Sequence, residues 1–174
     1  LVHAGDALVL VDCGLFQGLK QLRLHNRSAL AVPSRSIDAV VLTQALPAPS
    51  GFLPRLVELG FEGPVFATQA TVELCQLLLP EAGRLLEEEA RQANQAGYTK
   101  HAPAKPLYTE DMARRALLQL RAQPFDELFE PVPGFAARLR PSGQVLGAAC
   151  VHLRCGPHTL LHAGTLGRYD DPLL

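Results

Sequence analysis

The run from Ile37 to Leu42 constrains the fold of this chain more than any other, because it is rich in β-branched residues and almost uninterrupted in its apolar character. Runs of this kind are typical of a strand that is buried on both faces of a sheet. Residues 43–51 follow with the sequence Thr-Gln-Ala-Leu-Pro-Ala-Pro-Ser-Gly, and residues 52–59 then have helical spacing up to Gly60. The pattern predicts a central strand that leads through a short loop into a helix.

Strand patterns occupy both ends of the chain, and helical patterns occupy its middle. Further strands are predicted at 7–11, 64–67, 135–140, 148–155 and 159–162, with a turn at Gly156-Pro157. Further helices are predicted from Thr68 or Thr71 to a break after Leu79 at Pro80, at 81–96 up to Gly97, and from Thr109 to about Leu120. Residues 19–30 fit either a helix or an irregular segment. This order favours a layered α/β (α+β) sandwich over a strict doubly wound sheet.

The composition of the 174 residues is that of one globular domain with a core of its own, with 48% hydrophobic and 19% charged residues. The net charge of −1 does not support the strong basic field of a chain that binds nucleic acid by itself, although a basic patch on one face stays open. No apolar run reaches the roughly 20 residues of a membrane span, so no membrane partner is expected. The four cysteines (Cys13, Cys75, Cys150 and Cys155) lack disulfide-framework spacing, which favours a reduced, cytoplasmic protein.

Several stretches, in order along the chain, carry a resemblance to a known family. They are 11–18 (VDCGLFQG), 37–43 (IDAVVLT), 50–56 (SGFLPRL), 96–101 (AGYTKH), 106–110 (PLYTE), 141–149 (PSGQVLGAA) and 163–169 (AGTLGRY). With these motifs the chain resembles the metallo-β-lactamase core of the β-CASP ribonucleases, which are RNA-processing metallo-hydrolases. The resemblance implies a four-layer αββα sandwich that spans residues 1–174 as a single domain and is incomplete at both ends. It also implies a β-CASP domain after residue 174.

The metal-ligand positions of that family hold other residues in this chain. The family carries His-x-His-x-Asp-His after the central strand, a later histidine and a later aspartate. The corresponding residues here are Gln44, Leu46, Ala48, Pro49, Gln144 and Thr165. Leucine, alanine and proline have no lone pair for a metal, while glutamine and threonine offer only neutral oxygens. The family's two zinc ions activate a hydroxide and clamp the scissile phosphate, so we predict no zinc cofactor and no hydrolysis by that mechanism.

One polar residue of the family's site is retained. In the family, an aspartate at the position of Asp12 orients a ligand histidine. Because that histidine is missing, we expect Asp12 to hold the loop before Gly14. Gln144 and Thr165 lie about a hundred residues beyond Gln44 in the sequence, and the resemblance predicts that all three converge on one centre.

A second group of ligand-type residues lies late in the chain, at Cys150, His152, Cys155, His158 and His162. Strand alternation places Cys150 and His152 on one face and Cys155 on the other. His158 and His162 are four residues apart on a strand, about 13 Å, which is too far for one metal ion. An ordinary hairpin is therefore favoured over a zinc site, with His162 near the old cleft.

Smaller features receive structural interpretations first. Ser50 is expected to cap the helix that follows it, and the run Glu87-Glu88-Glu89 is expected on a solvated helix face. Arg55, Lys100 and Arg168 are candidate phosphate contacts in a residual groove.

Three functional hypotheses follow from these observations. The leading one is a catalytically inactive pseudo-hydrolase that binds or scaffolds a protein partner in RNA processing, with an active family member as a candidate partner. Its apolar cleft, lined by residues 46–49, would receive a segment of that partner. The alternative is an active metal-dependent phosphodiesterase or ribonuclease whose ligands lie outside the usual motifs, at His152, His158 or His162, or come from a partner chain. The third is a copy without function.

Overall fold

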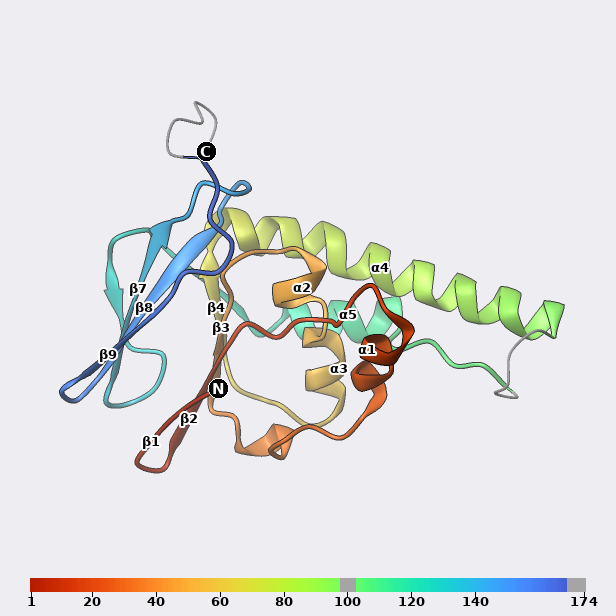
Figure 1. The fold of residues 1–174 in the computed structure, drawn as a ribbon, viewed down its shortest axis with the longest axis horizontal. Coiled ribbons are helices and arrows are strands. Elements are labelled where there is room, and N and C mark those ends of the chain that lie inside the picture. Colours follow the sequence, from red (N-terminus) through yellow and green to blue (C-terminus); the bar gives the residue numbers. More distant parts are fainter. Residues whose placement is uncertain (98–102, 169–174) are drawn as a thin grey trace.

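The computed structural model describes residues 1–97 and 103–168, which form two β-sheets packed face to face with helices on one side (Figure 1). The first sheet has the order β1-β2-β3-β4-β5, in which β1 and β2 are antiparallel and the other neighbours are parallel. Its strands are β1 (Val2–Ala4), β2 (Ala7–Val11), β3 (Ala39–Val41), β4 (Val65–Thr68) and β5 (Leu120–Gln123).

The second sheet is antiparallel throughout and comes from the C-terminal part of the chain. Its order is β6-β7-β8-β9. The strands are β6 (Leu128–Phe129), β7 (Phe135–Pro141), β8 (Ala149–Cys155) and β9 (His158–His162). Leu128 and Leu161 on its outer face are 62% and 57% exposed, so none of the described residues forms a layer over them.

The helices lie over the first sheet. They are α1 (Lys20–Leu24), α2 (Pro47–Ser50), α3 (Leu53–Glu58), α4 (Gln69–Ala96) and α5 (Glu110–Leu117), with 3₁₀ turns η1 (His25–Arg27) and η2 (Ser34–Ser36). Figure 1 shows α4 running across the top of the molecule and extending past its body. No described helix is both long and apolar enough to cross a membrane. The undecided segment 19–30 contains both a short helix and irregular backbone.

The central strand β3 is buried on both faces, as its sequence predicts. Val40 points into a core shared with the helices, where Leu42, Leu53 and Leu56 also lie. Ala39 and Val41 point into a second core between the two sheets. Alternate residues of β3 thus contribute to the two cores, which is the pattern expected when a parallel strand lies between two layers.

Two helix ends follow the predicted chemistry. Gly97 ends α4 in a left-handed conformation with φ of 67°, which costs glycine little because it has no Cβ. Thr68 begins the same helix, because its side chain accepts a hydrogen bond from the backbone N–H of Thr71. The alternative cap, Thr71, lies inside the helix.

The predicted helix break at Pro80 is wrong. The helix α4 continues through Pro80 from Gln69 to Ala96. Proline removes one backbone hydrogen bond from a helix interior, at a cost of about 3 kcal/mol. Here the surrounding turns are stabilised by tertiary packing: Pro80 itself is buried, and Gly83 lets the backbone at Thr109 approach closely.

Two further elements differ from prediction. Residues 47–50 form the helical turn α2, because prolines tolerate the first turn of a helix, where no backbone N–H partner is needed. The helix that begins after Thr109 ends at Leu117, and the chain then forms β5, which joins the sheet beside β4. Apolar and polar residues do not alternate regularly in β5, so its sequence alone does not predict a strand. It is a strand because it pairs with β4 at the edge of the first sheet.

Candidate functional site

Asp12 connects three parts of the chain. It leaves β2 with a positive φ of 61°, and one carboxylate oxygen accepts a hydrogen bond from the backbone N–H of Thr43 at 2.7 Å. The other oxygen accepts from the Thr43 hydroxyl at 3.0 Å and lies 3.1 Å from Nε2 of His162. Burial raises the pKa of Asp12 above its ordinary value, while the contacts with Thr43 and His162 lower it. This arrangement agrees with the expectation that Asp12 holds its loop.

The loop after Asp12 packs directly on α2. The backbone N–H of Cys13 donates to the carbonyl of Pro49 at 2.6 Å, and that of Leu15 donates to Pro47 at 2.9 Å. A Cβ atom on Gly14 would lie 1.3 Å from the carbonyl oxygen of Ala48, so only glycine fits there. Pro49 is buried, which contradicts the expectation that it lines an open cleft. Pro47 and Ala48 are exposed and Leu46 is half-buried, as that cleft requires.

The predicted convergence of distant positions is visible at Gln44 and Thr165. Nε2 of Gln44 lies 3.3 Å from the hydroxyl oxygen of Thr165, across 121 residues of sequence. The loop that carries Thr165 continues alongside the loop that carries Gln144, because the Gly167 N–H donates to Ser142 at 2.8 Å. Three loops, residues 43–49, 142–147 and 163–168, therefore meet at one edge of the sheets.

The polar groups at this meeting point are incompletely paired. Gln44 is only 4% exposed, yet its side-chain oxygen has no hydrogen-bond partner among the described residues. The side-chain oxygen of Gln144 is also buried and unpaired within the part of the chain that the structure describes. A buried acceptor without a partner is costly, typically about 1–3 kcal/mol.

This set of donors does not fit a two-zinc centre. Catalytic zinc takes three protein ligands, mostly imidazole nitrogens and carboxylate oxygens. Across residues 1–97 and 103–168, no three histidine, cysteine or acidic side chains are grouped so that they could hold a metal ion. Asp12 and His162 are in contact, but they are two groups, and Asp12 already accepts two hydrogen bonds from Thr43.

The late cysteines and histidines are distributed as strand alternation predicts. Cys155 packs against the core between the sheets, whereas His152 lies opposite Arg138 and Leu161 on the outer face. The thiol of Cys150 donates to the carbonyl oxygen of Ala163, with 3.3 Å between Sγ and the oxygen. His162 contacts Asp12, which in turn binds Thr43 at the start of the 43–49 loop.

Two minor predictions change. Ser50 does not cap the next helix. Its hydroxyl donates back to the carbonyls of Ala45 and Leu46, and Phe52 precedes α3 without a side-chain hydrogen bond that caps the helix. Among the candidate phosphate contacts, Arg55 lines a separate cavity and Arg168 is the last residue of the 163–168 loop. Lys100 is outside the described residues.

Sequence reasoning missed the role of Thr43, whose backbone and hydroxyl both bind Asp12. The sequence feature that indicates this role is a residue with a hydroxyl group, Thr43, close after the buried strand β3. Sequence reasoning also missed a cavity lined by Arg27, Arg35 and Arg55, because its lining combines the segment 27–35 with residues 55 and 59, which meet only in the folded chain.

Sequence comparison relates the chain to two kinds of RNA-linked protein. It is 30% identical over 174 residues to ribonuclease TTHA0252 of Thermus thermophilus, a match that covers 100% of this chain and 36% of that protein. It is 27% identical over 170 residues to transcription termination factor FttA of Cenarchaeum symbiosum, covering 95% of this chain and 24% of that one. The chain thus spans about a third or less of these relatives. No protein-family model matches it.

Structure comparison decides the fold. A metallo-β-lactamase of Cronobacter sakazakii with a HARLDQ motif aligns over 99% of this chain and 54% of its own, with a TM-score of 0.56 and 19% identity. This chain has the metallo-β-lactamase fold. The fold class predicted from the motifs is therefore confirmed, and so is the resemblance to the β-CASP ribonucleases, because the sequence relatives match along nearly the whole chain. The six positions at which the resemblance predicts metal ligands lie on the three meeting loops.

Proposed function

We propose that this chain is a catalytically inactive metallo-β-lactamase/β-CASP-like pseudo-hydrolase that serves as a binding or scaffolding module in RNA processing. One observation carries the proposal. Where the three loops meet, the groups in reach of one another are the Gln44 amide and the Thr165 hydroxyl, with aliphatic residues around them. Neither group supplies the charge or the basic nitrogen that a zinc-bound hydroxide needs.

The link to RNA comes from the relatives, one of which is named a ribonuclease and another a transcription termination factor. The proposal places this chain in the same type of machinery, in the cytoplasm. There the four cysteines, all free in the structure, stay reduced.

The proposed partner is a protein, with an active member of the same family as the first candidate. Each of the three meeting loops presents a leucine: Leu46 is half-buried, Leu146 is 58% exposed and Leu166 is 63% exposed. Exposed apolar side chains on adjoining loops favour contact with another protein over contact with water. The loss of charged ligands makes this edge more apolar than in an active enzyme.

Zinc content tests the inactivity. Purified protein, dialysed and analysed by inductively coupled plasma mass spectrometry, should hold well under one zinc per chain. A positive control restores the family's ligands with Gln44→His, Leu46→His, Ala48→Asp, Pro49→His, Gln144→His and Thr165→Asp. Stoichiometric zinc in the natural chain that disappears with His152→Ala, His158→Ala or His162→Ala would replace this proposal with the active phosphodiesterase.

Association tests the binding role. Sedimentation velocity of this protein mixed with an active family member from the same organism should show a complex. Leu146→Asp and Leu166→Asp should weaken it, while Leu118→Asp, on a residue that is 76% exposed just beyond α5, should not. Absence of a complex at high micromolar concentration rejects the active family member as partner.

A further inference from the structure

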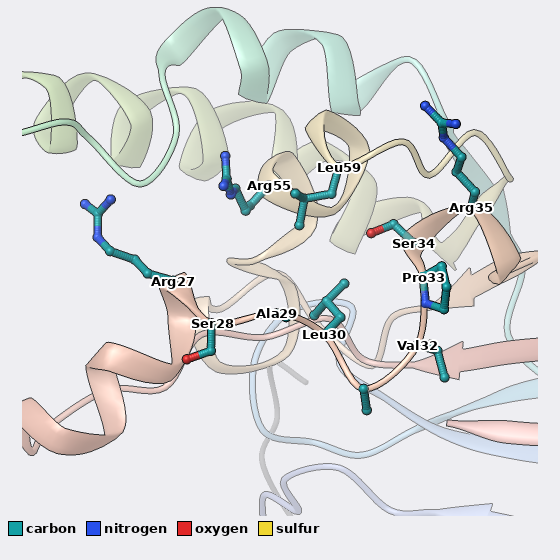
Figure 2. Close-up of a pocket in the computed structure, with 11 residues that line it drawn as sticks. Arg27, Ser28, Ala29, Leu30, Val32, Pro33, Ser34, Arg35, Arg55 and Leu59 are labelled. Atoms are coloured by element: carbon teal, nitrogen blue, oxygen red, sulfur yellow. The ribbon is translucent and has the colours of Figure 1, made fainter.

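A cavity of about 570 Å³ lies between the segment 27–35 and the helix α3 (Figure 2). Its volume is within the range of about 300–1,000 Å³ that small-molecule sites occupy in proteins. The three charged side chains in its lining are all arginines: Arg27, Arg35 and Arg55. Figure 2 shows Arg27 and Arg35 at opposite ends of the cavity, with Arg55 of α3 and Leu59, which follows that helix, between them.

These arginines differ from those of the helices α4 and α5. Arg84, Arg91, Arg114 and Arg115 each form an ion pair with a nearby carboxylate. Within the part of the chain that the structure describes, none of the cavity arginines has a carboxylate within salt-bridge distance, and the cavity lining contains no acidic residue. Their positive charge is therefore not neutralised by a neighbouring side chain.

A neutral hydrogen bond orients one of the three, and the side chain of another lies beside Gly60. Arg27 donates from one terminal nitrogen to the backbone carbonyl of Lys105 at 2.7 Å. Arg35 extends across Gly60, where a Cβ atom would come within 2.8 Å of its Nε. A carbonyl partner leaves the charge in place and fixes the direction of the group. Such pre-orientation lowers the entropy cost of binding a ligand.

The remaining lining is mostly apolar, and its polar side chains are those of Ser28 and Ser34. Leu30, Val32 and Leu59 supply aliphatic surface, and Ser34 is only 6% exposed. The Ser34 hydroxyl is directed into the space between the 27–35 segment and α3 (Figure 2). The cavity therefore combines separated cationic groups, an aliphatic surface and a hydroxyl group.

We propose that this cavity binds a nucleotide phosphate, either in a free mononucleotide or in a strand of RNA. Guanidinium groups bind phosphate oxygens through paired charge-assisted hydrogen bonds, and the aliphatic surface accommodates a base or ribose. None of the six former metal positions is in the lining, so the site is separate from the loop edge described above. The net charge of −1 is no obstacle, since a local field depends on where charges lie rather than on their sum.

Fluorescence anisotropy tests the site with three probes: labelled AMP, a labelled single-stranded oligouridylate, and inorganic phosphate as a competitor. Arg55→Gln should weaken binding about 10-fold or more, because it removes a charge-assisted contact. Arg55→Lys should restore part of it, since the charge returns without the paired geometry. Tighter binding of the oligouridylate than of AMP would identify RNA as the source of the phosphate, and the reverse would identify a free nucleotide.

Arg84→Gln is the matched control, because this exposed arginine is paired with Glu81 on another face. It should leave the dissociation constant unchanged, and raising the salt concentration from about 0.05 M to about 0.3 M should weaken binding to the natural chain. Equal weakening by Arg55→Gln and Arg84→Gln would overturn the proposal by showing a diffuse charge effect. So would the absence of binding by every probe. Neither result bears on zinc content, so this site and the proposed inactivity fail independently.

Discussion

Two groups of residues lie side by side at the loop edge and differ in how completely their polar atoms are paired. Asp12, Gly14 and Thr43, which we term the loop frame, make short hydrogen bonds or a close backbone contact. Gln44, Gln144 and Thr165, which we term the former centre, include two buried oxygens without a partner among the described residues. The polar atoms of Asp12 and Thr43 in the loop frame are paired by short hydrogen bonds, whereas two buried oxygens of the former centre have no partner among the described residues.

This difference shows that the arrangement of the loop backbone does not depend on complete pairing of the neighbouring polar side chains. The frame keeps the backbone of β2, β3 and α2 in register, whatever the loops carry between them. Within the part of the chain that the structure describes, the former centre contributes no such short hydrogen bonds, and its two unpaired oxygens cost free energy of folding. The backbone of this edge therefore keeps its arrangement although the side-chain oxygens of Gln44 and Gln144 have no partner among the described residues.

Gly14→Ala should have the largest effect. The new methyl group would lie 1.3 Å from the Ala48 carbonyl oxygen, so the backbone of α2 must shift, and we expect a loss of about 3 kcal/mol or more in the free energy of unfolding. Urea denaturation measures it. Gly5→Ala is the control, because its Cβ site is open and only its positive φ of 60° opposes the change, at about 1–2 kcal/mol. Equal losses would show that the close approach is not maintained.

Thr43→Val should have the next largest effect. It keeps the shape of the buried side chain but removes the hydroxyl that donates to Asp12, and we expect a loss of about 1–3 kcal/mol. Thr159→Val on the exposed strand β9 should change stability by less than about 0.5 kcal/mol. A neutral Thr43→Val would remove Thr43 from the frame.

Gln44→Met should have a small effect of the opposite sign. It removes an unpaired buried oxygen at nearly constant volume and gives up a long contact to Thr165, so stability should be unchanged or should rise by up to about 1 kcal/mol. Thermal unfolding measures the change. A loss similar to that of Thr43→Val would contradict the distinction between frame and former centre.

The pH dependence due to Asp12 should be the smallest effect. Because burial raises the folded-state pKa of Asp12, its protonated form is favoured on folding, and the associated stability is present below the ordinary pKa and lost as pH rises through the raised value. Asp12→Asn cannot titrate and tolerates the positive φ. The stability of the natural chain relative to this variant should therefore fall between acidic and neutral pH in urea titrations. A rise over that range would reverse the sign of the assigned shift.

Local patterns predicted the parts of the fold that depend on local chemistry. The β-branched run at β3, the glycine end of α4 and the strand alternation at Cys150 and Cys155 all follow from residue type and period. The continuation of α4 through Pro80 does not follow from local patterns, because packing against distant residues outweighs one missing backbone hydrogen bond. Propensity cannot measure that packing.

The candidate sites divide in the same way. Motif order predicted that Gln44 and Thr165 meet, and their contact confirms it. The arginine cavity could not be predicted, since Arg27 and Arg55 come together only after α3 folds back over the preceding segment. Cavities lined by separated side chains are a product of tertiary structure and leave no periodic trace in the sequence.

The pairing of Asp12 with both Thr43 and His162 has a consequence for the order of folding. The Thr43 contact closes 31 residues and the His162 contact closes 150, so the first forms at a much lower entropic cost. During synthesis, Asp12 therefore meets β3 early, while its last partner becomes available only when β9 has emerged and paired with β8. Contacts of such long range slow folding, so the contact between Asp12 and His162 belongs to its last steps.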